Sequence, residues 1–359
     1  MLFSPTHLGK IELKNAIVMA PMTRNRSTSN NIPEAIVSTY YAQRASAGLI
    51  ITEGTSPSPN GVGYPRIPGI YNDEQIAAWK TVTTAVHEKG GRIFLQLMHT
   101  GRVSHTSCLP SGAIILAPSA IKMTGQIYTD EAGMQDYSEP KEMTLEEIAA
   151  AKQEYVQASI NAIAAGFDGV ELHAANGYLL EQFIAPMSNH RSDEYGGSIE
   201  NRCRFVLEVA KATSEAIGAE RVGIRFSPNG AFNHILPYPE VEQTYTYLAA
   251  GMNALNLVYV HLVDHSSMGT PAVGEHVVAG IRAAFKGTLI LSGGYDKASA
   301  EKDLVDGKAQ LIAFGRPFIA NPDFVRRMNS DSELNAPDFN TFYTPGEKGY
   351  TDYPSLSLV

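Results

Sequence analysis

Short β-branched runs alternate with longer amphipathic stretches along the whole chain, a pattern typical of repeated βα units that build a parallel sheet. Eight runs have strand character: Ala16–Thr23, Leu49–Ser56, Arg92–Thr100, Gly169–Ala174, Val222–Ser227, Leu255–Leu262, Thr288–Ser292 and Gln310–Gly315. Eight stretches have helical periodicity: Glu34–Ser46, Asp73–Lys89, Leu145–Ala165, Ile199–Ile217, Glu240–Asn253, Glu275–Phe285, Ala298–Val305 and Asp323–Met328. Eight βα repeats predict an α/β protein with a closed TIM (β/α)₈ barrel.

Two departures from this repeat are visible. A long segment after the third predicted strand, Gly101–Met143, is rich in Gly, Pro, Ser and Thr. Because insertions at the carboxyl end of a barrel strand lie on the catalytic face, we expect this inserted loop to form a lid or wall of the active site. Before the first strand, Leu2–Lys14 carries a Gly9-Lys10 turn between two extended runs, which predicts an N-terminal β-hairpin that closes the barrel's bottom. We expect residues 1–359 to form one barrel domain.

Two helix starts carry capping signals. Thr144 with Glu147 has the spacing of a capping box, and Asn72 with Gln75 has the same spacing with an Asn cap. These polar pairs indicate where the second and third predicted helices begin.

Composition narrows the class of protein. The 359 residues are 44% hydrophobic and 18% charged, which excludes disordered, collagen-like and coiled-coil chains. The net charge of −9 argues against bulk binding to nucleic acid or anionic lipid. Cys108 and Cys203 are too far apart for a CxxC motif, the N-terminus MLFSPTHLGKIELKN lacks the pattern of a signal peptide, and no apolar run could span a membrane. We therefore expect a soluble, cytoplasmic protein.

Glycines follow the last two predicted strands, as Gly293-Gly294 and as Gly315 before Arg316. Loops in these places of a barrel commonly bind phosphate, because Gly lets backbone N–H groups approach the phosphate oxygens. Arg316 could add a charge-assisted contact. The alternative is that both are tight turns and that Arg316 is solvated.

Two polar residues lie inside otherwise apolar strands. Arg225 interrupts Val222–Phe226, where an unpaired charge is costly, so we expect it to meet an anion. The alternative is an internal salt bridge to a carboxylate such as Glu171. Gln96 raises the same question, since its amide suits a planar heterocycle but could equally be a satisfied buried amide.

The end of the fourth predicted strand carries three chemically useful groups within six residues. His173 and Asn176 could bind a carbonyl or nitro oxygen, and the phenol of Tyr178 could deliver a proton. This combination suggests oxyanion stabilisation with general acid catalysis. A metal site is not expected, because the other strand ends do not supply a matching set of Asp, Glu and His.

Taken together, these segments resemble the Old Yellow Enzyme family of flavin ene-reductases, in the branch of N-ethylmaleimide reductase and pentaerythritol tetranitrate reductase. The resemblance rests on Met19–Arg24, Gln96 with His99–Arg102, Glu171–Leu180, Arg191–Arg202 and Gly349–Pro354. It implies a barrel that binds FMN, is reduced by diffusible NADPH or NADH, and passes hydride to an activated alkene.

The resemblance also assigns cofactor contacts. Thr23 would hydrogen-bond the flavin C4 carbonyl, Gln96 would pair with the pyrimidine edge, and Arg225 would face N1 and the C2 carbonyl. Pro21, Met22 and Gly54 would line the flavin ring. The phosphate would be bound by Gly293, Gly294, Gly315 and Arg316.

For the substrate, the resemblance implies that His173 and Asn176 hold its oxygen, that Tyr178 protonates its α-carbon, and that Tyr343 covers the pocket. Asn176 stands where other members carry His, and Met98 stands where several classical members have Trp, so we expect a reshaped substrate pocket. Expected partners are activated alkenes and the nicotinamide, with a monomer or weak homo-oligomer as the assembly.

Two other functions remain open from the sequence. One is a non-flavin phosphate-binding barrel lyase or isomerase, for which no catalytic Lys or carboxylate stands out at a strand end. The other is a flavin-binding carrier or sensor without turnover.

Overall fold

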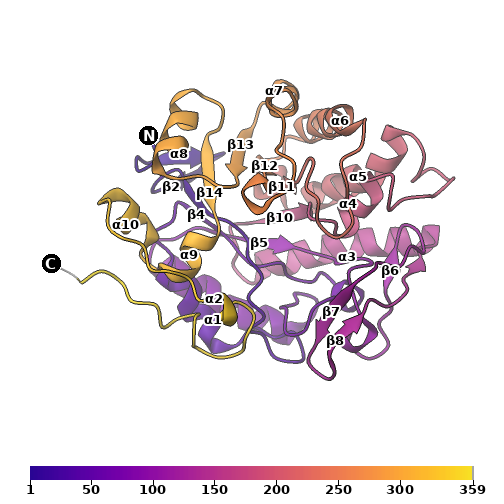
Figure 1. Cartoon of the computed structure of the whole chain (residues 1–359), viewed down its shortest axis with the longest axis horizontal. Coiled ribbons are helices and arrows are strands. Elements are labelled where there is room, and N and C mark those ends of the chain that lie inside the picture. Colours follow the sequence, from indigo (N-terminus) through magenta and orange to yellow (C-terminus); the bar gives the residue numbers. More distant parts are fainter. Residues whose placement is uncertain (358–359) are drawn as a thin grey trace.

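Eight parallel strands close into a barrel in the computed structural model, which describes residues 1–357 (Figure 1). Around the barrel the strands follow their order in the chain: β3 (Ile17–Met19), β4 (Leu49–Ile51), β5 (Ile93–Leu97), β10 (Gly169–Ala174), β11 (Val222–Phe226), β12 (Tyr259–Val263), β13 (Thr288–Ser292) and β14 (Leu311–Phe314). The predicted TIM barrel is therefore confirmed.

The eight predicted helices are present, with ends that match the prediction or differ from it by at most three residues. They are α1 (Ala35–Gln43), α2 (Asp73–Glu88), α3 (Leu145–Ala164), α5 (Ile199–Ile217), α6 (Val241–Ala254), α7 (Glu275–Ala284), α8 (Lys297–Val305) and α10 (Phe324–Asn329). Thr144 and Glu147 form the predicted capping box, and the Asn72 side chain accepts from the Gln75 backbone N–H. The short helices α4 (Leu179–Ile184) and α9 (Arg316–Ala320) were not predicted from the sequence.

Several strands are shorter than their sequence runs. The sixth run, expected at Leu255–Leu262, becomes strand only at Tyr259, because Leu255 caps α6 and Asn256 adopts a left-handed conformation with φ 57°. The first run ends as strand at Met19. Pro21 and Thr23 therefore lie in a loop beyond the strand's end, on the face where barrel active sites form.

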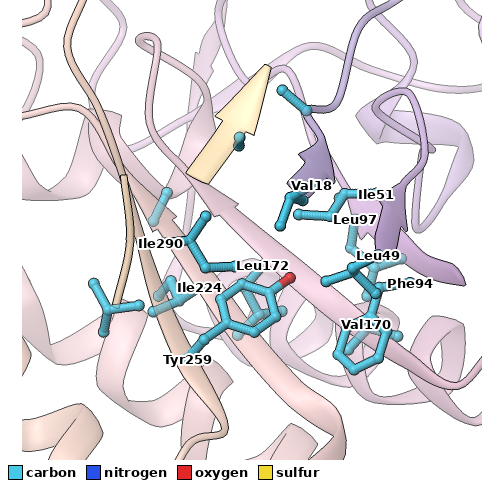
Figure 2. Packing of buried hydrophobic residues seen from close by; sticks show 14 of the residues in the cluster. Val18, Leu49, Ile51, Phe94, Leu97, Val170, Leu172, Ile224, Tyr259 and Ile290 are labelled. Carbon is cyan, nitrogen blue, oxygen red and sulfur yellow. The ribbon is translucent and has the colours of Figure 1, made fainter. Parts of the chain in front are cut away.

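Two aromatic rings lie close together inside the amino-terminal part of the barrel. Phe94 on β5 and Tyr259 on β12 have ring centroids 5.8 Å apart, although β10 and β11 lie between those strands in the sheet (Figure 2). Glycines on the intervening strands make room for them. A Cβ on Gly223 would come within 2.2 Å of the Tyr259 ring, and one on Gly169 within 2.5 Å of the Phe94 ring.

The next interior layer is polar. Side chains alternate between the two faces of a strand, so residues two positions beyond the aromatic layer point inward as well. These residues are Gln96, Glu171, Arg225 and His261, and all four are buried. The period of two therefore explains why polar residues interrupt apolar strands. These residues form the floor of a site, above the layer that contains Phe94 and Tyr259.

The N-terminal hairpin and the insertion lie at opposite ends of the barrel. The hairpin pairs β1 (Thr6–Leu8) with β2 (Ile11–Leu13), and its Gly9 turn faces Val258, just before the amino end of β12, which confirms that it covers the barrel's bottom. The insertion contains β6 (Leu116–Ala117), β7 (Gln126–Thr129), β8 (Gly133–Asp136) and β9 (Lys141–Glu142). It is therefore partly ordered into strands, with an antiparallel β7–β8 pair at its centre. Among the described residues, no helix is long and apolar enough to cross a membrane.

Candidate active site

Two cavities meet at the carboxyl ends of the barrel strands. The first, here called the aromatic cavity, has a volume of about 890 Å³ and is lined by residues that include Gln96, Met98, His173, Tyr64, Tyr128, Tyr137, Tyr178, Phe339 and Tyr343. The second, here called the glycine groove, has a volume of about 550 Å³ and is lined by residues that include Met22, Ser292, Gly293, Gly294, Gly315 and Arg316. Both cavities share Pro21, Thr23, Asn176, Arg225 and Tyr343, so they form one continuous site.

All but one of the residues singled out from the sequence line this site. The exception is Gly54, which lines neither cavity. A Cβ there would lie 2.5 Å from Met98 Sδ, so the glycine makes room for the Met98 side chain. Gly54 therefore affects the wall of the aromatic cavity indirectly, by leaving space for Met98.

Arg225 lines both cavities and has no hydrogen-bond or ion-pair partner among residues 1–357. Its side chain is buried, its Nε has no hydrogen-bond partner, and no ion pair joins it to any described residue. The alternative of a direct salt bridge to Glu171 is therefore not found among residues 1–357. Burial lowers the pKa of Arg225, while the Glu171 charge acts in the opposite direction. A buried guanidinium of this kind needs an anion or a polar acceptor from a ligand.

Gln96 has one end of its amide fixed from below. Its Nε2 donates to Glu171 Oε1 at 2.8 Å, and Glu171 Oε2 lies 2.9 Å from His261 Nδ1. His261 Nε2 in turn lies 3.0 Å from Ser292 Oγ, at the edge of the glycine groove. The buried-amide interpretation is therefore correct for the Nε2 end. Because that end is occupied, Gln96 Oε1 is the end left to face the cavity, and it can accept an N–H from a heterocycle.

Glycine geometry shapes the groove. Gly293 has a φ of 121°, and a Cβ there would lie 1.9 Å from the Asp264 carbonyl oxygen. Gly294 also has a positive φ, 69°, which disfavours other residues. Gly315 immediately precedes α9, with Arg316 as its first residue. Backbone N–H groups can therefore approach a ligand closely along this groove.

His173 and Tyr178 face each other at the end of β10. Their ring centroids are 4.9 Å apart in an edge-to-face arrangement. Burial, then the charge of Arg225, holds the pKa of His173 well below its usual range, so the imidazole is neutral at physiological pH. A neutral imidazole keeps one N–H, which can donate to a substrate oxygen.

Tyr178 is held by a second tyrosine. Its hydroxyl lies 3.2 Å from that of Tyr64, in the loop before α2, and the two rings also pack edge to face. Burial raises the pKa of Tyr178 to about 12. The phenol is therefore protonated at neutral pH and can act as an acid.

The backbone of Asn176 is fixed by two hydrogen bonds. The residue is left-handed, with a φ of 59°, its N–H donates to Ser227 Oγ at 2.9 Å, and its carbonyl accepts from Asn233 Nδ2 at 2.7 Å. Its side-chain Oδ1 lies 2.7 Å from His265 Nε2. The amide nitrogen thus remains the free polar end of the side chain.

The outer wall comes from the insertion, from the C-terminal part of the chain and from the loop before α2 that carries Arg66. The insertion supplies Tyr128 and Tyr137, and the C-terminal part supplies Tyr343, which is 59% exposed. Arg66 joins these parts, since it donates to the Tyr343 carbonyl at 3.1 Å and pairs with Asp130 of the insertion. The insertion therefore forms a wall of the site, as its position in the sequence predicted.

Sequence reasoning missed several residues of the site. Tyr64, Tyr137 and His265 all line it, and of these Tyr64 and Tyr137 lie away from the ends of the barrel strands. Tyr64 follows a Gly-rich turn and His265 follows β12 by two residues. The position of His265, just past a barrel strand, was a signal that could have identified it.

Comparisons with known proteins identify the family. The family model described as "NADH:flavin oxidoreductase / NADH oxidase family" matches residues 1–335. The chain is 44% identical over 364 residues to 12-oxophytodienoate reductase 1 of Oryza sativa subsp. japonica, covering 100% of this chain and 94% of that one. It is 42% identical over 361 residues to a probable flavin mononucleotide-dependent alkene reductase of Leishmania infantum, covering 99% and 98%.

Solved structures give the same result. Morphinone reductase is 45% identical and superposes with a TM-score of 0.95, covering 99% of this chain and 96% of that one. The Old Yellow Enzyme homologue from Zymomonas mobilis is 41% identical, with a TM-score of 0.94 and 99% coverage of both chains. The chain therefore belongs to the NADH:flavin oxidoreductase family, the family of Old Yellow Enzyme.

Proposed function

We propose that the protein is an FMN-dependent ene-reductase, which uses NADPH or NADH to reduce the C=C bond of activated alkenes. The substrate class comprises α,β-unsaturated ketones and aldehydes, maleimides and nitroalkenes. The observation that carries the proposal is the convergence of His173, Asn176 and Tyr178 on the cavity into which the unpaired Arg225 projects. Relatives named as an alkene reductase and as 12-oxophytodienoate reductase support it.

The residues present fit FMN. Arg225 offers a buried, unpartnered guanidinium, and Gln96 has its Nε2 end occupied so that its oxygen can accept the pyrimidine N–H. Thr23, Pro21 and Met22 line the adjoining wall. The glycine groove offers close backbone approach and Arg316 for a phosphate. When bound there, FMN supplies hydride transfer between the nicotinamide and the alkene.

His173 and Asn176 would bind the substrate's activating oxygen. Both are uncharged donors, the imidazole because of its lowered pKa and the amide by its nature. Hydrogen bonds to this oxygen withdraw electron density from the conjugated alkene, and they strengthen as negative charge develops there. The β-carbon then accepts hydride more readily.

Tyr178 would supply the proton to the α-carbon. It lies two residues beyond Asn176, at the wall of the same cavity, and its pKa of about 12 keeps it protonated. The hydroxyl of Tyr64, 3.2 Å away, orients the phenol. Met98 and Tyr343 would shape and cover the substrate space.

The two other functions that the sequence left open are addressed by different observations. Membership of a flavin oxidoreductase family argues against a non-flavin lyase or isomerase. A carrier or sensor without turnover is tested by assaying the purified holoenzyme anaerobically with NADPH or NADH and 2-cyclohexenone. We expect yellow protein that releases FMN on denaturation and oxidises more than one equivalent of nicotinamide per flavin only when an acceptor is present. Bound FMN without turnover of any activated alkene would favour the carrier.

The proposal also covers the location, domain organisation and assembly of the protein. We expect a cytoplasmic location, which agrees with Cys108 and Cys203 both being free thiols. We also expect a single barrel domain that acts as a monomer or a weak homo-oligomer. Size-exclusion chromatography with light scattering measures the assembly directly.

A further inference from the structure

His265 contacts the substrate-binding amide from the side of the glycine groove. It follows β12 and precedes the 3₁₀ helix Ser266–Met268. Its Nε2 lies 2.7 Å from Asn176 Oδ1, and its ring packs against Phe232 with centroids 4.5 Å apart. The side chain is only 7% exposed, so the contact is not a passing surface interaction.

This contact acts on the one part of Asn176 that the backbone leaves undetermined. Hydrogen bonds to Ser227 and from Asn233 fix the main chain of Asn176 in its left-handed conformation. They do not decide which end of the amide faces the substrate, since oxygen and nitrogen are nearly the same size. Only the nitrogen end can donate to a substrate oxygen, so an amide turned the other way would repel it.

The charges around His265 favour its neutral form. Arg225, Asp264 and Arg316 are the charged groups that act on it. Burial, followed by the charge of Arg225, lowers the pKa of His265 to about 4. A neutral imidazole has one N–H, and when that proton is on Nε2 it donates to Asn176 Oδ1.

We propose that His265 is a positioning residue, which donates from Nε2 to Asn176 Oδ1 and thereby turns the Asn176 N–H₂ toward the substrate oxygen. This rests on the proposed function for the role of Asn176. His265, in the loop after β12, would then act together with the substrate-binding residues His173 and Asn176. The pair would then be prepared for an anionic or carbonyl oxygen before the ligand arrives, which lowers the cost of binding.

The test uses the oxidised holoenzyme and a phenolate ligand, 4-hydroxybenzaldehyde, so that no turnover is needed. Its dissociation constant is measured by absorbance titration for the wild type and for His265→Phe and His265→Gln. Phe keeps a planar ring against Phe232 but has no donor, whereas Gln restores an N–H. We expect His265→Phe to weaken phenolate binding by about tenfold, because the hydrogen bond from Asn176 to the charged phenolate oxygen would be lost. We expect His265→Gln to recover most of this affinity. His276→Phe, at an exposed histidine of α7, is the matched control.

A double-mutant cycle separates positioning from general damage. In an Asn176→Ala background, His265→Phe should have no further effect on the phenolate dissociation constant, because the amide that it orients is gone. Equal weakening in both backgrounds, or wild-type binding by His265→Phe, would overturn the proposal. FMN content is measured for each variant and binding is expressed per bound flavin. Failure of the proposed function appears separately, as absent turnover of alkenes by the wild type.

Discussion

Removing the hydroxyl of Tyr178 should slow the proton-dependent half of the reaction and little else. Tyr178→Phe keeps the ring that packs against His173 at 4.9 Å and against Tyr64 at 6.3 Å. It deletes one hydrogen bond, to Tyr64, which contributes about 1 kcal/mol to stability, so the fold should survive. General acid catalysis is worth about 10² to 10⁴ in rate, or about 2.7 to 5.4 kcal/mol of activation free energy.

The assay is anaerobic stopped-flow absorbance of the two half-reactions. Reduction by NADPH needs no proton from Tyr178 and should be unchanged, while reoxidation by 2-cyclohexenone should slow by the factor above. Nitroalkenes should be largely spared, because their nitronate product can leave and be protonated in water. Tyr64→Phe is the matched control, since it removes the neighbouring hydroxyl but retains the proposed donor. Unchanged reoxidation by cyclohexenone in Tyr178→Phe would refute the assignment, and equal losses for every acceptor would indicate general damage.

The same reasoning gives a pH dependence. Because burial raises the pKa of Tyr178 to about 12, the group keeps its proton at every lower pH. Reoxidation by cyclohexenone should therefore show no loss attributable to Tyr178 between about pH 6 and 10, the upper limit being the ordinary pKa of a phenol. A loss of rate as the pH rises through 8 to 10 would mean that the donor has a lower pKa.

Three further predictions concern the rest of the site. Arg316→Ala should mainly weaken FMN retention, measured by fluorescence on dilution, whereas Arg225→Ala should also shift the flavin reduction potential; full FMN content and an unchanged potential in both variants would contradict the assignment. Replacing His173 and Asn176 together by Ala should abolish the long-wavelength charge-transfer band of phenolate ligands and slow enone reduction by on the order of 10² or more, so an undiminished band would remove the oxygen-binding role. Met98→Trp should reduce activity on substituted cyclic enones more than on small ones, because Met98 is buried beside Val62, Ile67 and Tyr178; equal effects across substrate sizes would show that Met98 does not face the substrate.

The barrel could be predicted because its signals are local. Alternating strand and helix periods repeat eight times, and the capping box at Thr144 marks a helix start through residues three apart. Polar residues in apolar strands, such as Arg225, were also visible, since period-two alternation places them on the inner face. The two short helices α4 and α9 were not predicted.

What the sequence could not predict depends on contacts between distant loops. His265 and Asn176 are 89 positions apart, and the sequence around each residue does not indicate their hydrogen bond. The same holds for Tyr64 and Tyr178, 114 positions apart. Gly54 is expected by resemblance to line the flavin ring, and its close approach to Met98 is a contact that the sequence does not show. The choice of partner for Glu171, which is Gln96 and His261 rather than Arg225, likewise depends on side-chain directions inside the barrel.

The most direct test of the central claim is the structure of the product that the purified enzyme makes from 2-cyclohexenone with NADPH or NADH in D₂O. The account predicts cyclohexanone, formed in a one-to-one ratio with the oxidised nicotinamide. It also predicts deuterium at the α-carbon, because the exchangeable phenol of Tyr178 supplies that proton. Mass spectrometry and NMR of the product give both results from one sample. Formation of the allylic alcohol, or no product despite bound FMN, would contradict the account.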